Sequence, residues 1–225
     1  MLIRSLLLYT DNLEAQYDFY IEKLGFELQE RWNLAFCFKA GKSLVTFHSE
    51  PDKTATPVHF AFGIQNQDTS GIEDFLKDKV ELIVPKTQNT AIVDFKNWKA
   101  KSIYFYDADS NIVEFIIRTD DMKSDSKSFD SNNIKGICEI GIPCGNCHII
   151  AERIRNEVKI DSYIGESAEF IPMGNSDGLL ILVQEGKKKW YPTDNIVKYG
   201  KLKATIQNHG YIADIVCENG LVNIE

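Results

Sequence analysis

Residues 102–118, SIYFYDADSNIVEFIIR, decide the fold, because they predict two β-strands joined by a tight polar turn. Apolar β-branched and aromatic residues supply the strands, and residues 107–111 supply the turn. Glu114 lies in the middle of the second, otherwise apolar strand. A lone carboxylate is costly in such a position unless another group pairs with it. The sequence therefore predicts a partner for Glu114 elsewhere in the chain.

The composition is that of an ordinary globular protein with an excess of acidic residues. The 225 residues are 44% hydrophobic and 26% charged, and the formal net charge is −8. This charge argues against binding to nucleic acid or to anionic membranes. No apolar stretch is long enough to span a bilayer, and the run at residues 6–8 lacks the length and cleavage site of a signal peptide. We expect no nucleic-acid or membrane partner.

The cysteines favour a reducing compartment. There are five, an odd number, spread from residue 37 to residue 217. Together with the missing secretion signal, this predicts free thiols and a cytoplasmic location. Cys144 and Cys147 form one C-x-x-C pair, but the second Cys or His pair that a structural zinc site needs is missing at suitable spacing. We interpret the pair as incidental to a strand-to-helix junction.

A strand–helix–three-strand unit recurs along the chain. Residues 2–47 predict the first copy and residues 57–118 the second, with Asp11 and Ser70 as the expected helix caps. Adding 134 to the apolar positions of the first strand and helix gives apolar positions again, which predicts a third copy. We therefore expect paired modules over 1–118, a polar linker over 119–133, and a third module plus a reduced, helix-less fourth unit over 134–225.

Three motifs carry a resemblance to a known family. They are Asn12-Leu13-Glu14 at the start of the first helix, Leu24-Gly25-Phe26 after its end, and Asp-x-Asp-x-Asn-x-x-Glu-Phe over residues 107–115. Together with the repeat, these motifs resemble the vicinal oxygen chelate superfamily, which includes glyoxalase I, extradiol dioxygenases and metal-free bleomycin-binding proteins. The resemblance is close over 1–118 and looser over 134–225. It implies an α+β fold of repeated βαβββ modules that form half-open barrels around a cleft.

The resemblance also implies where a metal would bind, since ligands in metal-using members come from the first and last strand of each module. These positions fall on Ser5 and Thr46 in the first module, which are poor ligands, and on His59 and Glu114 in the second. His59 and Glu114 suit a divalent iron, manganese, nickel or zinc ion. His48, two residues beyond Thr46 on the same strand face, would complete a His59–Glu114–His48 set. The alternative is a hydrogen-bonded His59–Glu114 pair without metal.

The second half of the chain offers fewer candidate metal-binding or catalytic residues. Its equivalent positions include Glu139 and Ile181, and we do not expect these residues to form a metal site. We expect Glu139 to form an ion pair with Lys201 instead. Residues 187–191, KKKWY, are interpreted as a solvated turn. Arg118 either holds an anionic substrate group at the cleft mouth or is exposed to solvent. Four aromatic residues either line a ligand pocket or pack in the core, namely Trp32, Phe38, Phe47 and Tyr104.

Three functions stay open at this point. The first is a metal-dependent lyase or dioxygenase that acts on a small vicinal-oxygen substrate, with Glu114 and His59 as its catalytic pair. The second is a metal-free small-molecule-binding protein of the bleomycin-resistance type. The third is a homodimer without a small ligand, since a unit that lacks its helix leaves apolar surface for a partner.

Overall fold

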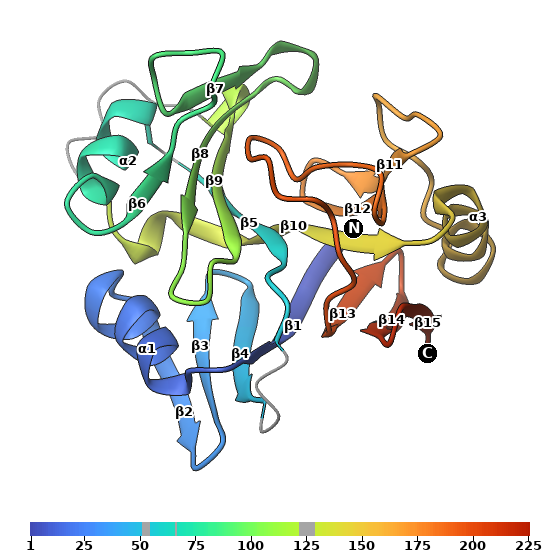
Figure 1. Cartoon of the computed structure of the whole chain (residues 1–225), viewed down its shortest axis with the longest axis horizontal. Coiled ribbons are helices and arrows are strands. Elements are labelled where there is room, and N and C mark those ends of the chain that lie inside the picture. Colours follow the sequence, from blue (N-terminus) through green and yellow to red (C-terminus); the bar gives the residue numbers. More distant parts are fainter. Residues whose placement is uncertain (51–54, 66, 122–128) are drawn as a thin grey trace.

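The computed structural model describes residues 1–50, 55–65, 67–121 and 129–225 of the chain. The strands form two open mixed sheets, and the helices lie at the periphery (Figure 1). This arrangement confirms the predicted α+β fold of repeated modules. Among the described residues, no helix is both long and apolar enough to cross a membrane.

Two modules make up the first half of the chain. The first contains β1 (Leu2–Thr10), α1 (Leu13–Tyr17), a π-helical turn (Asp18–Lys23), β2 (Glu27–Trp32), β3 (Ala35–Ala40) and β4 (Ser43–Ser49). The second contains β5 (His59–Ile64), α2 (Thr69–Leu76), β6 (Glu81–Ile83), β7 (Ile92–Phe95), β8 (Ala100–Tyr106) and β9 (Ile112–Arg118). The predicted hairpin over 102–118 is therefore confirmed as β8 and β9.

The second half contains a shortened third module and a unit made of strands. The third module contains β10 (Ile134–Cys144), α3 (Cys147–Val158), β11 (Phe170–Asn175) and β12 (Gly178–Gln184). The last unit contains β13 (Leu202–Asn208), β14 (Tyr211–Glu218) and β15 (Leu221–Ile224). Residues 201–225 are described throughout and include no helix, as the sequence predicts. The buried face of α3 is formed by the residues that the repeat identified, Cys147, Ala151, Ile154 and Val158.

Each sheet takes strands from both sides of residues 119–133. Sheet A has the order β15-β14-β13-β1-β4-β3-β2, and sheet B has the order β11-β12-β10-β5-β9-β8-β6, with β7 paired to β8. The antiparallel pairs β1–β13 and β5–β10 join the two modules of each sheet. The second module therefore shares its sheet with the third, whereas the resemblance had implied that it shares a cleft with the first. The domain boundaries stay a prediction, and residues 122–128 of the predicted linker lie outside the described residues.

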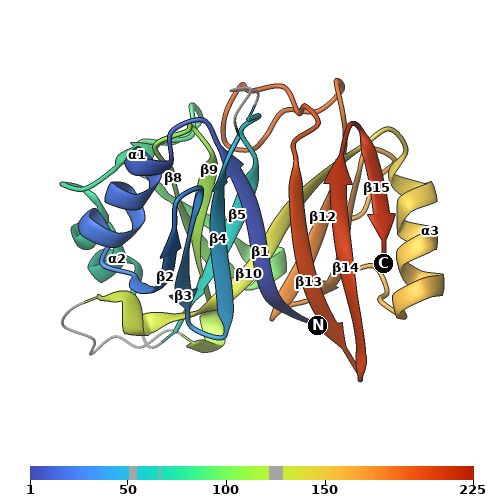
Figure 2. The same ribbon diagram turned by 90° about the horizontal axis from the view of Figure 1, so that it is seen from below.

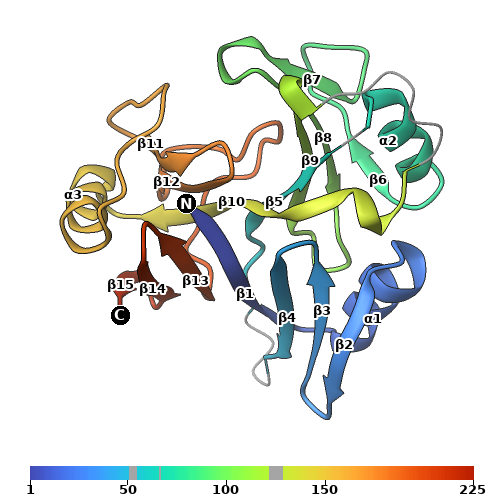
Figure 3. The same cartoon turned by 180° about the vertical axis from the view of Figure 1, so that it is seen from behind.

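The sheets share one apolar core. Figure 2 shows sheet A from β2 to β15 between α1 and α3, and Figure 3 shows β10 crossing the molecule towards α3. The Tyr20 ring stacks on Phe38 of β3, with ring centroids 5.0 Å apart. Phe26 lies 5.1 Å from Phe62 of β5, which extends the cluster from sheet A to sheet B. Phe38, like Phe47, is fully buried, so both belong to the core.

The residues that cap the first two helices lie one or two positions away from the predicted caps. Asn12, rather than Asp11, accepts a hydrogen bond from the Ala15 amide and caps α1. Asp68, rather than Ser70, accepts from the Gly71 amide and caps α2. Both are short polar side chains at the N-cap, so the type of cap was predicted correctly and its position was not.

The turn between β8 and β9 depends on one buried carboxylate. Asp107 accepts hydrogen bonds from the Asn111 backbone amide at 2.9 Å and the Asn111 side chain at 2.8 Å. It also accepts from the Tyr20 hydroxyl at 2.9 Å and from Gln16 at 3.1 Å, which fastens the hairpin to the first helix. Burial raises the pKa of Asp107 to about 6, although these hydrogen bonds oppose the effect.

Candidate functional site

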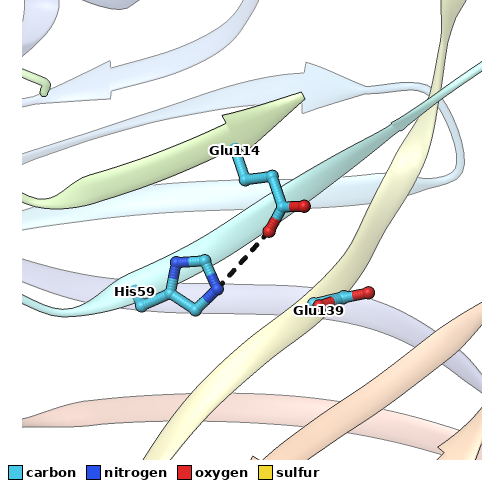
Figure 4. A group of neighbouring side chains, drawn as sticks. All are labelled: His59, Glu114 and Glu139. Atoms are coloured by element: carbon cyan, nitrogen blue, oxygen red, sulfur yellow. Dashed lines mark ion pairs between the residues drawn. The ribbon is translucent and has the colours of Figure 1, made fainter. Parts of the chain in front are cut away.

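Three strands of sheet B bring one histidine and two glutamates together. Ala61 of β5 lies opposite Glu114 of β9 on one side and opposite Glu139 of β10 on the other. Opposite residues on neighbouring strands share a face of the sheet, and so do residues two apart on one strand. His59 therefore faces the same side as both carboxylates, and Figure 4 shows the three side chains gathered there. The small Ala61 side chain leaves space between the two acids.

A β-bulge in β10 sets the direction of Glu139. Ile137 pairs with Phe62, but Glu139 pairs with Ala61, so the register shifts between them. Without the shift Glu139 would lie opposite Phe60, on the face that packs into the core. β1 has the same register shift between Ile3 and Ser5, which are the positions 134 residues earlier.

The three side chains are buried and close. One ligand atom from each of His59, Glu114 and Glu139 lies within 4.8 Å of the others, and His59 Nε2 is 3.6 Å from Glu114 Oε2. The Nδ1 atom of His59 lies 2.9 Å from the carbonyl oxygen of Ile112. A carbonyl only accepts, so Nδ1 carries a proton, and Nε2 is the ring nitrogen that faces the carboxylates. A metal could therefore bind at Nε2, while the Nδ1 contact is of the kind that metal-bound histidines make with their other ring nitrogen.

Two acidic side chains and the cation of Arg118 meet at the site. The Arg118 guanidinium donates to Glu139 Oε1 at 3.2 Å and to the Trp98 carbonyl at 3.3 Å. Burial and the Glu114 charge raise the pKa of Glu139 to about 8, and Arg118 opposes this rise. Burial and the Glu114 charge also hold the pKa of Tyr104 well above its ordinary value. A divalent cation would neutralise the two carboxylates, so the donor set fits a metal of the kind that imidazole and carboxylate ligands bind.

A cavity of about 320 Å³ opens beside these side chains. This volume is within the range of small-molecule sites. Besides His59, the two glutamates and two lysines, Lys188 and Lys189, its wall is largely aromatic and includes Phe95, Trp98, Tyr104, Phe170, Trp190 and Tyr191. Of the aromatic residues predicted either to line a ligand pocket or to pack in the core, Tyr104 lines this cavity. Trp32 is exposed on β2 and is not part of its wall.

The connection from β12 to β13 supplies one wall of the cavity. Trp190 is only 6% exposed, and its ring centroid lies 5.5 Å from that of His59. It packs on Gly141 of β10, where an added Cβ would come within 2.5 Å of the indole Cη2. The prediction of a solvated turn over residues 187–191 is therefore wrong for Trp190. Lysines usually mark solvated loops, and no local pattern showed that this one folds back over sheet B.

Residues 2–129, more than half of the chain, match the family described as the Glyoxalase/Bleomycin resistance protein/Dioxygenase superfamily. The chain belongs to this superfamily. No curated protein matches it. Among solved structures it is similar to a putative dioxygenase from Bacillus subtilis subsp. subtilis str. 168, with 13% identity and a TM-score of 0.57 over 84% of this chain and 65% of that one. It is also similar to a glyoxalase I mutant from Zea mays, with 12% identity and a TM-score of 0.56 over 84% of this chain and 70% of that one.

The ligand positions that the superfamily resemblance implies divide between the two sheets. Ser5 and Thr46 lie on β1 and β4 of sheet A, and so does His48, whose Nδ1 is 2.8 Å from the Ser49 carbonyl oxygen. The described residues gathered with His59 and Glu114 include Glu139 and do not include His48. The fourth position of the sheet B site is Ile181 of β12, which is apolar and lines the cavity.

Glu139 is the candidate site residue that the sequence reasoning did not place beside His59 and Glu114. Its expected ion pair with Lys201 is wrong, because Glu139 pairs with Arg118 while Lys201 pairs with Glu218 at 3.0 Å. The signal was present, since the 134-residue offset maps Ser5, a first-strand ligand position, onto Glu139. The sequence did not show that β10 lies beside β5.

Proposed function

We propose that this protein binds a divalent metal ion through His59 Nε2, Glu114 and Glu139, and that it acts on a small substrate with two adjacent oxygen atoms as a lyase or dioxygenase. The observation that carries the proposal is the convergence of one correctly oriented imidazole and two buried carboxylates beside an aromatic-lined cavity. Iron, manganese, nickel and zinc all suit such donors, and the two carboxylates favour the harder ions such as manganese.

The bound metal would act as a Lewis acid that polarises the substrate oxygens. The remaining steps belong to the side chains around it. Arg118 holds Glu139 through Oε1 and leaves the other carboxylate oxygen free to face the site. Tyr104 keeps its proton at neutral pH, so its hydroxyl can donate a hydrogen bond to a substrate oxygen. Trp190 and the other aromatic walls exclude water from the reacting atoms.

A metal-free binding protein is the second candidate. The apolar Ile181 at the fourth ligand position favours it, and so does the ion pair between Arg118 and Glu139. Without a metal, Glu114 would have a partner in His59 when Nε2 of that ring carries a proton. The aromatic cavity would hold a flat apolar molecule in either case.

Metal binding separates the two candidates. Protein purified without chelators should contain a first-row divalent metal, and thermal unfolding should shift upward on addition of Mn²⁺, Fe²⁺, Ni²⁺ or Zn²⁺. Glu114→Gln and Glu139→Gln should each abolish the shift. His48→Ala is the matched control, since His48 lies in the other sheet, and it should keep the wild-type shift. If the purified protein contains no metal and its unfolding temperature does not rise with any of these ions, the metal site is refuted and the metal-free binding protein is the supported function.

A further inference from the structure

Lys188 places a positively charged side chain on the wall of the cavity. It is half-buried, it lines the same cavity as His59, Glu114 and Glu139, and its Nζ lies 5.8 Å from the centre of the Phe170 ring. No carboxylate in the described part of the chain lies within ion-pair distance of this ammonium group. Removing part of its hydration without supplying a counter-charge is unfavourable.

The neighbouring lysines differ from Lys188 in this respect. Lys189 pairs with Asp194 at 2.7 Å, and Asp194 also pairs with Lys86, so the Lys189 charge is compensated. Lys187 is exposed and does not line the cavity. Only Lys188 of the three both faces the cavity and lacks a counter-charge.

The backbone around Lys188 fixes its position. Its carbonyl oxygen accepts from the Val197 amide at 2.9 Å, and Val197 is fully buried. Two residues later the Trp190 amide donates to the Asn195 carbonyl at 2.9 Å. These bonds close the β12–β13 connection into a compact turn, and Lys188 in this turn lines the cavity.

The charges of the site add to the argument. A divalent ion would balance Glu114 and Glu139, and Arg118 would then add one positive charge beside them. Lys188 adds a second positive charge on the cavity wall. A neutral ligand would leave the Lys188 ammonium unpaired, whereas an anionic group would give it the missing partner.

We infer that the cavity selects an aromatic carboxylate, whose ring packs among the aromatic walls and whose carboxylate pairs with Lys188. This inference rests on the proposed function only in that the other end of the ligand would face the metal. The chemistry of the wall, a charge-assisted contact at one side of an apolar aromatic cavity, defines the ligand class.

The test compares two probes that differ in charge, 3,4-dihydroxybenzoate and 3,4-dihydroxybenzamide. Their binding to the full chain is measured by isothermal titration, with and without Mn²⁺. A charge-assisted contact predicts that the wild type binds the acid about tenfold more tightly than the amide. Lys188→Met should abolish this preference, Lys188→Arg should keep it, and the matched control Lys187→Met should also keep it.

The outcomes distinguish this inference from the proposed function. Equal affinity for the two probes in the wild type, or an unchanged preference in Lys188→Met, would overturn the role of Lys188 even if Mn²⁺ binds. Absence of Mn²⁺ binding would refute the metal site, and the preference measured without Mn²⁺ would then still decide the role of Lys188. Thermal unfolding of each variant shows that it is folded before the probes are compared.

Discussion

Gly141→Ala should destabilise the protein, mainly through its close approach to Trp190 at the candidate site. The added Cβ would lie 2.5 Å from Cη2 and 3.0 Å from Cζ3 of Trp190, and 3.3 Å from the His59 Cβ. The indole ring is rigid and buried, so it must move as a whole away from His59. Inserting a methyl group into such a packed site costs about 1–3 kcal/mol of unfolding free energy.

The contact can be isolated with a double-mutant cycle. Trp190→Phe removes the part of the indole that carries Cη2 and Cζ3, so Gly141→Ala should cost little in that background. We expect a coupling energy of about 1–2 kcal/mol between the two positions. Urea unfolding followed by circular dichroism gives the free energies, and tryptophan fluorescence reports the displacement of Trp190 in the single variant.

Gly63→Ala is the matched control, because Gly63 is also a strand residue of sheet B. Its added Cβ would meet nothing closer than 3.4 Å, which is an ordinary contact, so its effect should be within about 1 kcal/mol and of either sign. If Gly141→Ala unfolds at the wild-type urea concentration with unchanged fluorescence, Trp190 does not pack on Gly141 and the wall of the cavity is wrong.

Two further predictions concern buried charges. Asp107 has a pKa of about 6 in the folded protein against an ordinary 3.8, so between these values the folded state binds more protons than the unfolded state and stability falls as the pH rises. About 3 kcal/mol present below pH 4 should be lost above pH 6, and Asp107→Asn should flatten this part of a urea-midpoint profile. Arg118→Met removes the cation that opposes the rise in the pKa of Glu139 from its ordinary 4.5 to about 8, so the metal-free variant should lose stability, and the loss should grow as the pH rises above 8, where Glu139 is ionised in the wild type. Because Mn²⁺ would replace the missing charge, its thermal shift should be larger in Arg118→Met than in the wild type, and an equal or smaller shift would contradict this.

Local signals in the sequence predicted most elements of the fold. The strand-forming residues and the polar turn in residues 102–118 predicted β8 and β9, and the 134-residue offset predicted β10 and the buried face of α3. The partners of each module were not predictable, because strand pairing between residues as far apart as 61 and 139 leaves no local pattern. The sequence therefore identified the repeated units, but not that the second module would share its sheet, and the cavity on it, with the third module rather than with the first.

The candidate site was predicted in part for the same reason. His59 and Glu114 belong to one module, so their closeness followed from the first and last strands of that module lying side by side. Glu139 and Trp190 reach the site through sheet B pairing and through the β12–β13 connection. Both depend on tertiary contacts. The sequence could not single out Lys188 either, because its lack of a carboxylate partner among the described residues is visible only in the structure.

The equivalent place in sheet A shows why one sheet presents a site and the other does not. Leu7 of β1 lies opposite Thr46 of β4 and Lys203 of β13, as Ala61 lies opposite Glu114 and Glu139 in sheet B. The leucine side chain occupies the space that Ala61 leaves open. Thr46 and Lys203 replace the two acids with a neutral group and a cation, and the Lys203 ammonium pairs with Asp214 at 2.6 Å. Ser5, at the position of His59, offers no imidazole. A cation would meet a positive charge in sheet A and two carboxylates in sheet B, so the same topology supports a metal site in only one of its two sheets.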